Sequence, residues 1–348
     1  MALKEPLIDA LVTESELQRS FLAEPVETIY FGGGTPSVLD IRHLEKILDA
    51  IYKNYNIAPA PEITLEANPD DLNPAKLAGL KSLNINRLSI GMQTFHDGLL
   101  KFMNRIHSAN ESIQAFHLAR NAGFDNVNCD LIYGIPGEDE EMLLHDLRTL
   151  NDLRPEHISA YCLTIEDKTV FGIWKKRNKL QEIEEDRAAW QFEKVHEFLS
   201  KKGYTAYEVS NYCLPGFHSR HNTGYWRDKP FLGLGPGAHS YDGENRSFNI
   251  ANNSLYIKSI EKVHIPATVI DLTAGDRINE YILTSLRTIW GCDLAHIKQR
   301  HNVDILEKNG KAVSQLVDQG LIALNGNIIC LTPKGRPLAD FISAKLFI

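Results

Sequence analysis

Seven residues whose side chains or backbone could bind a ligand stand at or near the ends of apolar, β-branched runs in this 348-residue sequence. They are Gly33, Gly34, Thr35, Glu66, Gln93, Arg105 and Asp130. Carboxylates accept hydrogen bonds from an ammonium group or from sugar hydroxyls, and an arginine can bind a carboxylate through two parallel bonds. Consecutive glycines expose bare backbone to a ligand. Taken together, these residue types favour a ligand that joins a nucleoside to an amino acid.

Each member of this set also has a structural interpretation. A glycine run is typical of a tight turn between a strand and a helix. A carboxylate inside an apolar strand is costly to bury alone, so Glu66 and Asp130 could instead pair with Arg87 or Arg105. The glycines at 32–34 match neither the G-x-G-x-x-G pattern of dinucleotide sites nor the sequence of a phosphate-binding P-loop.

A second group, HNTGYW at residues 221–226, combines a histidine with two aromatic residues. His218 precedes His221, and His239 follows it. Imidazole is a common ligand of haem iron, and aromatic rings can pack on a porphyrin face. The alternative is that His221 is a hydrogen-bonded loop histidine, while Tyr225 and Trp226 belong to the hydrophobic core.

The cysteines predict no metal site. The chain contains Cys129, Cys162, Cys213, Cys292 and Cys330. Consecutive members are at least 33 residues apart, so the short spacings that are typical of metal ligands do not occur. We expect reduced and mostly buried thiols.

Over the first two-thirds of the chain, β-branched runs alternate with amphipathic stretches, which indicates parallel βα units. Strands are predicted at residues 26–31, 62–67, 87–91, 126–132, 157–163 and 204–209, and helices at 7–22, 40–55, from 74 onward, 97–103, 110–122, 140–153 and 184–202. In a barrel of such units, the C-terminal ends of the strands surround one opening, where ligands bind. The sequence therefore predicts an α/β fold with a partial (β/α)6 barrel of the TIM type.

Beyond this barrel the pattern changes. Residues 203–251 are rich in glycine, histidine and aromatic residues and contain few regular runs. From about residue 273 short helices follow, and then Asn325-Gly326 between two apolar runs predicts a hairpin. We interpret this region as a small winged-helix-like α+β domain. The predicted boundaries are 1–210 for the partial barrel, 211–265 for a connecting region with the HNTGYW segment, and 266–348 for the C-terminal domain.

The composition excludes several classes of protein. With 43% hydrophobic and 24% charged residues and a net charge of −8, the sequence is typical of a globular protein of the cytoplasm. It contains no apolar stretch long enough to span a bilayer and no secretion signal. Residues 271–348 carry 9 Lys and Arg against 8 Asp and Glu, which is too balanced for a nucleic-acid-binding surface.

Four segments occur in the order and spacing of a known family. They are FGGGTPS at 31–37, EANP at 66–69, LSIGMQTF at 88–95 and DLIYGIPG at 130–137. On these motifs the chain resembles the anaerobic coproporphyrinogen III oxidase family of radical S-adenosylmethionine (SAM) proteins, over nearly its whole length. The resemblance implies that Gly33, Gly34, Thr35, Glu66, Gln93, Arg105 and Asp130 contact SAM. It also implies that residues 132–135 pack near the adenine.

Within that family, HNTGYW resembles the H-N-x-x-Y-W motif of the haem-chaperone branch, the HemW-type proteins. The resemblance implies that His221 binds haem, which is then passed to haem-acceptor proteins, membrane-associated ones included. The alternative is an oxygen-independent coproporphyrinogen III oxidase, which removes carbon dioxide from two propionates of its porphyrinogen substrate. Whether the chain is an enzyme therefore stays open at this point.

The chain departs from the family pattern at its N-terminus. Family members carry C-x3-C-x2-C after the first barrel strand, and its three thiolates hold a [4Fe–4S] cluster. Here the barrel opens with a helix, although every later helix follows a strand. We therefore expect the first strand and its cluster loop to be missing, and residues 26–31 to form an uncovered sheet edge. A late start, a trimmed chain or a cluster-free relative would each explain this. Haem could still bind at His221.

Overall fold

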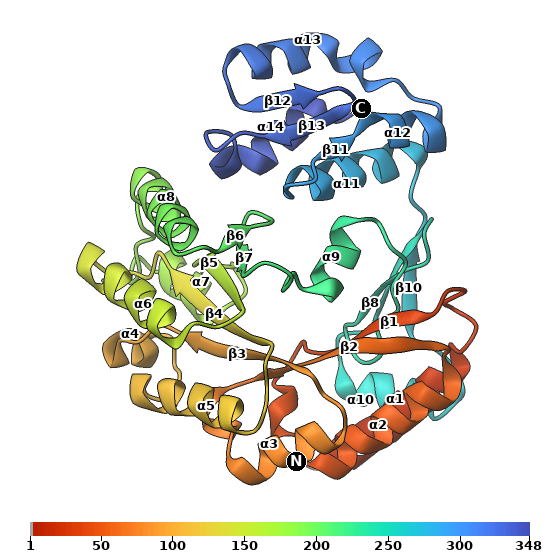
Figure 1. Cartoon of the computed structure of the whole chain (residues 1–348). Helices are drawn as coiled ribbons and strands as arrows, with labels where there is room; N and C mark the ends of the chain where they lie inside the picture. The colour runs from red at the N-terminus through yellow and green to blue at the C-terminus, as the bar shows by residue number, and fades with distance from the viewer. Residues whose placement is uncertain (1–2) are drawn as a thin grey trace. The chain divides into compact units, whose positions relative to one another are not determined.

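The computed structural model describes residues 3–348, and Figure 1 shows its helices and strands. The chain divides into two compact units. The sheet unit comprises Gly34–Val38 and Ile63–Ser219. The histidine unit comprises Met1–Gly33, Leu39–Glu62 and Arg220–Ile348. The domain boundaries predicted after residues 210 and 265 stay predictions.

The sheet unit is built on parallel strands, as the alternation of the sequence predicts. The second half of β2 (Ile57–Ala67) pairs with β3 (Arg87–Gln93), β3 with β4 (Val127–Tyr133), and β4 with β5 (His157–Cys162), each in parallel. All seven residues of β3 are buried, as is typical of a central strand with a parallel neighbour on each side. Their C-terminal ends therefore lie at one edge of the sheet.

The helices of this unit follow the strands in alternation (Figure 1). They are α3 (Pro74–Ser82), α4 (Asp97–Phe102), α5 (Ala109–Asn121), α6 (Glu140–Leu153), α7 (Val170–Lys176) and α8 (Glu185–Lys201), with short 3-10 turns at Pro36–Val38 and Pro69–Asp71. Local sequence fixes several starts: Asn73 and Asp139 cap α3 and α6, and Ser108 with Glu111 forms a capping box on α5.

The α/β fold with parallel strands is confirmed, but one detail of the predicted barrel is wrong. Residues 204–209 were expected to continue the parallel series. Instead β6 (Thr205–Ala206) is two residues long and pairs antiparallel with β7 (Asn211–Cys213), which is itself antiparallel to β5. The reason is the short connection between β6 and β7, since a parallel strand needs a crossover of a dozen or more residues.

The histidine unit begins with α1 (Lys4–Leu17), β1 (Val26–Phe31) and α2 (Ile41–Asn54), and continues after the sheet unit with α9 (Arg220–Trp226). The predicted helix at 7–22 therefore ends early, at Leu17. A small antiparallel sheet of β8 (His239–Tyr241), β9 (Arg246–Asn249) and β10 (Ala267–Ile270) follows, with α10 (Asn253–Ile260) between β9 and β10. Neither this sheet nor α9 was predicted.

β1 is the terminal strand of the seven-stranded order β1-β2-β3-β4-β5-β7-β6, so the expectation that residues 26–31 form a sheet edge is confirmed. One face of this edge strand is covered by α9. Thr28 and Tyr30 lie two residues apart and share one face of β1, and both contact His221 of α9. This short helix therefore packs against the edge strand.

The C-terminal part contains α11 (Ala274–Leu286), β11 (Cys292–Asp293), α12 (Leu294–His301), α13 (Ile305–Asp318), β12 (Ile322–Asn325), β13 (Ile328–Leu331) and α14 (Ala339–Leu346). The hairpin predicted from Asn325-Gly326 is confirmed: β12 and β13 pair antiparallel, and Gly326 has a φ of 63° in the turn. Helices α11 to α13 followed by this hairpin give the expected winged-helix-like arrangement around one apolar core.

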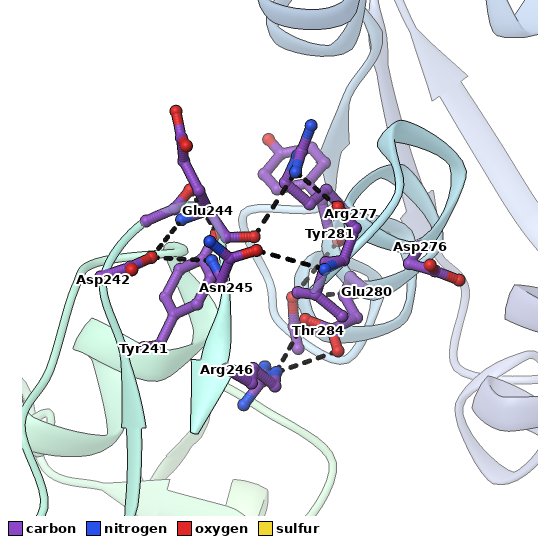
Figure 2. A network of polar contacts seen from close by, with 12 residues as sticks. Tyr241, Asp242, Glu244, Asn245, Arg246, Asp276, Arg277, Glu280, Tyr281 and Thr284 are labelled. Carbon is purple, nitrogen blue, oxygen red and sulfur yellow. Dashed lines mark hydrogen bonds and ion pairs between the residues drawn. The ribbon is translucent and has the colours of Figure 1, made fainter. Parts of the chain in front are cut away.

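Polar contacts join α11 to the small antiparallel sheet (Figure 2). Arg246 Nε of β9 lies 2.9 Å from both carboxylate oxygens of Glu280, and Arg277 donates to the carbonyl oxygens of Glu244 and Leu272. The ion pair is about one-third exposed on each side, so it contributes modestly to stability. Within residues 3–348, no helix has both the length and the apolar character needed to cross a bilayer.

Candidate functional site

The structure places most of the predicted ligand residues on the sheet unit, at the C-terminal ends of β2, β3 and β4. In the strand registers Glu66 of β2 is opposite Ser89 of β3, and Ser89 is opposite Asn128 of β4. Asp130 lies two residues beyond Asn128 and therefore on the same face of β4. The parallel registers thus bring Glu66 and Asp130 to the same region of the sheet.

A buried polar network holds the Asp130 carboxylate. Asn128 donates to it over 2.7 Å, and Ser89 donates to it over 3.4 Å. Burial raises the pKa of Asp130 to about 6, against the lowering effect of the Asn128 hydrogen bond, and the nearby Glu66 carboxylate adds to the increase. A positively charged ligand group beside this carboxyl group would stabilise its ionised form.

The same network extends to β5 and to Tyr207, the residue after β6. The amide oxygen of Asn128 contacts His157 Nδ1 at 2.6 Å and accepts from the Ser159 hydroxyl, while His157 Nε2 contacts the Tyr207 hydroxyl at 2.7 Å. Burial lowers the pKa of His157 well below its usual range, so this imidazole is neutral. Sequence reasoning missed Asn128, His157 and Tyr207. The polar residue at 128 inside an apolar strand was the available signal.

Gln93, the last residue of β3, and Arg105, which follows α4, lie near the end of β2. Gln93 has a φ of 69°, and the β3–β4 register shifts between Ile90 and Gln93. Such backbone is uncommon for a residue with a side chain and is concentrated at functional sites. A Cβ added to Gly91 would lie 2.7 Å from Gln93 Nε2, so the amide folds over that glycine. Arg105 donates to Asn68 Oδ1 over 3.4 Å.

Ser37, which follows the glycine loop, connects this loop to the residues after β2. Ser37 donates to the Asp71 carboxylate over 2.6 Å and accepts from the backbone N–H of Asn68 at 3.3 Å. Within the sheet unit, Thr35 is half-buried and Gly34 is exposed, with open space where a Cβ would be. Gly33, at the end of the histidine unit's first segment, is exposed and has a φ of 83°.

Glu138 holds the loop after β4 through hydrogen bonds. Its carboxylate accepts from the backbone N–H of Gly134 and from Gln191, both over 2.8 Å, and burial raises its pKa to about 7. Gly134 has a φ of 76°, and a Cβ there would lie 2.9 Å from Cys162 Sγ. Only glycine fits this turn, which orients residues 132–135.

Glu66, Gln93, Arg105, Asp130 and the Gly34-Thr35 segment thus gather along neighbouring strand ends of one unit. Their chemistry suits SAM: carboxylates for ammonium and hydroxyl groups, a guanidinium for a carboxylate, and open backbone at the glycines. That these residues bind SAM stays a prediction.

The second site is His221, at the start of α9 in the histidine unit. The buried Glu62 carboxylate accepts the backbone N–H groups of Arg220 and His221 at 3.1 and 3.0 Å. It thereby satisfies two donors at the beginning of the helix. The His221 side chain is fixed separately. Its Nδ1 lies 2.9 Å from the Thr28 hydroxyl, and its Nε2 lies 2.8 Å from the Tyr225 hydroxyl.

Aromatic rings enclose the imidazole. Tyr30 stacks on it at 4.6 Å between ring centroids with 17° between the planes, and Tyr225 meets it edge-on at 4.8 Å. The spacing in HNTGYW explains the second contact, because residues four apart share a face of a helix. Phe231 packs perpendicular to Tyr225 at 4.6 Å. The motif predicted His221, but Thr28, Tyr30 and Glu62 carried no signal in the sequence.

The neighbouring histidines have other surroundings. His218, in the sheet unit, packs against Tyr207 at 4.8 Å, and His239 of β8 packs against Phe248 at 5.6 Å. Trp226 lies under the Arg287 guanidinium, 5.8 Å from it. The two aromatic residues of the HNTGYW segment therefore have different contacts. Tyr225 contacts the imidazole, and Trp226 contacts Arg287 at the end of α11.

No cysteine belongs to a group of three potential metal ligands within residues 3–348, and the residues described here do not fit a [4Fe–4S] cluster. The group of His96, His145 and Asp146 does bring three potential ligands within 4.8 Å. Asp146, however, accepts from the Thr94 hydroxyl and the Phe95 N–H, and His96 contacts the Met142 carbonyl oxygen at 3.1 Å. These are the contacts of a carboxylate that fixes the turn after β3.

Comparison with known proteins supports this architecture. The Radical SAM superfamily model matches residues 10–150, and the HemN C-terminal domain model matches residues 272–338. The solved structure titled as coproporphyrinogen III oxidase (HemN) from Escherichia coli is similar with a TM-score of 0.85, covering 99% of this chain and 83% of that one. At 22% identity, this likeness shows the fold. The family models thus match a radical SAM region followed by a HemN-type C-terminal domain.

Relatives named "Heme chaperone HemW" are more similar in sequence. The Lactococcus lactis protein is 34% identical over 98% of this chain and 89% of its own length, and the Bacillus subtilis protein is 33% identical over 90% and 84%. The Mycobacterium tuberculosis protein is 34% identical over 97% and 85%. This chain belongs to the HemW family of radical SAM proteins, and the resemblance indicated by its motifs is confirmed.

Proposed function

We propose that this protein is a haem chaperone, which binds haem through His221 and passes it to haem-acceptor proteins. The observation that carries the proposal is the fixed, half-buried imidazole on α9, held by Thr28 and Tyr30 of β1 and by Tyr225. Imidazole nitrogen is a common axial ligand of haem iron, and aromatic side chains nearby suit a porphyrin face. The names of its relatives favour this function over coproporphyrinogen oxidation.

SAM is the second ligand in this proposal. Glu66 and Asp130 would accept hydrogen bonds from its ammonium group or ribose hydroxyls, Arg105 would bind its carboxylate, and the backbone at Gly33 to Thr35 would approach it. Gln93 would donate or accept through its amide, and residues 132–135 would pack near the adenine. In radical SAM proteins a reduced [4Fe–4S] cluster supplies the electron that cleaves SAM. The described residues assign no ligand to such a cluster.

The cellular setting belongs to the same proposal. We place the protein in the cytoplasm, with acceptor proteins that include membrane-associated ones. Nucleic acid is not among the proposed partners, because the charge of residues 271–348 is nearly balanced.

Haem titration tests the chaperone function directly. The purified chain is titrated with haemin while the Soret absorption is followed, in parallel with His221→Ala and with the control variant His239→Ala. Because His239 lies on β8 beside Phe248, the control is expected to bind haem as the wild type does. His221→Ala is expected to lose the spectral signature of an imidazole ligand and at least tenfold in affinity. Equal binding by all three proteins would contradict the proposal.

SAM binding is tested by calorimetry with Arg105→Ala and Lys101→Ala. Lys101 lies exposed on α4, four residues before Arg105, and serves as a charge-matched control. Loss of a charge-assisted pair with the SAM carboxylate is expected to weaken binding about tenfold or more in Arg105→Ala only. Identical affinities in the two variants would remove Arg105 from the proposed site.

A further inference from the structure

Both ring nitrogens of His221 are already engaged within the protein. Nδ1 lies 2.9 Å from Thr28 Oγ1, and Nε2 lies 2.8 Å from the Tyr225 hydroxyl. Iron binds a nitrogen through the lone pair of a neutral imidazole. One of these two hydrogen bonds must therefore break before His221 can bind haem iron.

The two partners differ in how firmly they are held. Thr28 lies within β1, where the backbone of a strand fixes its position. Tyr225 lies on α9, a helix of seven residues, and 38% of its surface is exposed. A rotation about the side-chain bonds of Tyr225 moves its hydroxyl away from Nε2 without disturbing the sheet. Tyr225 is therefore the partner that can leave.

The chemistry of the two hydroxyls agrees with this assignment. A phenol is a stronger donor than an aliphatic alcohol, because its pKa is near 10 and that of an alcohol is far higher. Nδ1–H then donates to Thr28 Oγ1, and the Tyr225 O–H donates to Nε2. In this tautomer Nε2 carries the lone pair that iron needs.

We propose that Tyr225 is a gating residue, which occupies Nε2 of His221 until haem displaces its hydroxyl, and that Thr28 is a positioning residue that holds the imidazole through Nδ1. The proposal rests on the proposed function, since it takes His221 as the haem ligand. A histidine that binds a metal commonly donates its other N–H to a fixed acceptor, and Thr28 is that acceptor here.

The other contacts of His221 support this division of roles. Tyr30 stacks on the flat face of the ring and Glu62 holds the backbone N–H of residue 221, so the ring itself stays in place when Tyr225 leaves. When haem departs, the Tyr225 hydroxyl returns to Nε2. This competition lowers the net affinity for haem, which suits a protein that must release its cargo to an acceptor.

The gate is tested with Tyr225→Phe, which keeps the ring against Phe231 and removes only the hydroxyl. Haem affinity is expected to increase about 2- to 10-fold, the value of one neutral hydrogen bond, with a slower release of haem to apomyoglobin. Thr28→Val, which keeps the shape of the side chain, is expected to lower haem affinity about tenfold, and Thr28→Ser to restore it.

Nitrogen-15 NMR of the haem-free imidazole supplies a readout that folding alone does not change. Wild-type His221 is expected to show a protonated Nδ1, and in Tyr225→Phe the Nε2 resonance is expected to shift as its hydrogen bond is lost. The gate is overturned if His221→Ala loses haem while Tyr225→Phe binds haem equally well or less well than the wild type. If His221→Ala binds haem unchanged, the proposed function fails together with the gate.

Discussion

The two candidate sites of this protein are built in opposite ways. The strand-end residues of the sheet unit come from segments up to 96 residues apart, between Gly34 and Asp130, yet parallel registers place them together. The His221 site has its central residues within one short helix, and its supporting groups Thr28, Tyr30 and Glu62 come from two distant strands. The first is held by backbone ladders, the second by individual side-chain contacts.

This difference determines what each site can do. A strand end cannot move without breaking main-chain hydrogen bonds along a buried sheet, so the sheet unit offers its ligand a preformed arrangement. A seven-residue helix held by a capping carboxylate can release one contact at a time. The comparison predicts that substitutions at the strand ends lower the free energy of unfolding, whereas substitutions around His221 mainly lower the affinity for haem.

The largest effect is expected from Asn128→Ala. Asn128 is buried, and its amide group bridges Ser89, Asp130, Ser159 and His157. Removing the amide leaves several buried polar groups without their partner, so the free energy of unfolding should fall by about 3 kcal/mol in a urea titration. The exposed Asn110 of α5 provides the control, and Asn110→Ala should stay within about 0.5 kcal/mol of the wild type.

A loss at Asn128 no larger than that of the control would break the comparison, because damage to the buried network at the strand ends would then leave global stability unchanged. Local unfolding measured by hydrogen exchange would report the same result independently: protection along β4 should fall in Asn128→Ala alone.

A second effect concerns the dependence of stability on pH. The folded-state pKa of Asp130 is about 6, above its ordinary value of 3.8, because burial favours the neutral acid. Between these two values the folded state binds more protons than the unfolded state, so this group makes stability fall as pH rises from about 4 to 6.5. Asp130→Asn should remove roughly 1–2 kcal/mol of that decrease, allowing for the partial exposure of the group.

The measurement is the difference between wild type and Asp130→Asn in unfolding free energy, taken at several pH values. Other buried acids such as Glu138 titrate in both proteins, and their contributions cancel in the difference. A difference that does not change with pH would show that Asp130 is solvated like a surface carboxylate, contrary to a preformed strand-end site.

The sequence predicted the strand-end site better than the surroundings of His221, for a physical reason. Strand and helix periodicity is local, and parallel strands oblige their ends to meet, so the sequence pattern alone is enough to place Glu66 and Asp130 together. The partners of His221 lie about 160 to 190 residues earlier in the chain. No local pattern marks Thr28 or Glu62 as hydrogen-bond partners, because only the tertiary fold brings them to α9.

The same reasoning explains two of the differences between the predicted and the observed fold. Thr205–Ala206 has the composition of a strand but is too close in sequence to Asn211–Cys213 for anything except an antiparallel turn. Helix α9 was not predicted because its sequence contains Gly224 and β-branched Thr223, which have weak helix propensity. The Glu62 cap and the contacts of Tyr225 compensate for that weakness.

A third and smaller effect is expected from Glu62→Gln, which tests the His221 site of the comparison. Gln keeps the size of the side chain but accepts only one of the two N–H groups at the start of α9. We expect a loss of about 1 kcal/mol in stability, with haem affinity reduced about fivefold as the helix frays. The control is Glu27→Gln, since the ion pair of Glu27 with Lys229 is exposed and its loss should change neither quantity.

Hydrogen exchange over residues 220–226 separates a local effect from a global one. Faster exchange confined to α9 in Glu62→Gln would agree with a site held by individual contacts. Faster exchange across β2 and β3 as well would show that Glu62 supports the sheet, and the contrast between the two sites would disappear.

The smallest effect is expected from Ser37→Ala, which tests whether the glycine loop belongs to the strand-end site. The Ser37 hydroxyl, 3% exposed, joins the Asp71 carboxylate to the backbone N–H of Asn68. Its removal should cost about 1 kcal/mol in stability and weaken SAM binding two- to fivefold, because Gly34 and Thr35 are no longer held beside the end of β2. Ser82→Ala is the control, as the exposed Ser82 hydroxyl donates only to the Gly79 carbonyl oxygen of its own helix. If Ser37→Ala binds SAM as tightly as Ser82→Ala does, the Ser37 hydroxyl does not preform the glycine loop. The loop then adapts to its ligand, and the sheet unit is not preformed throughout.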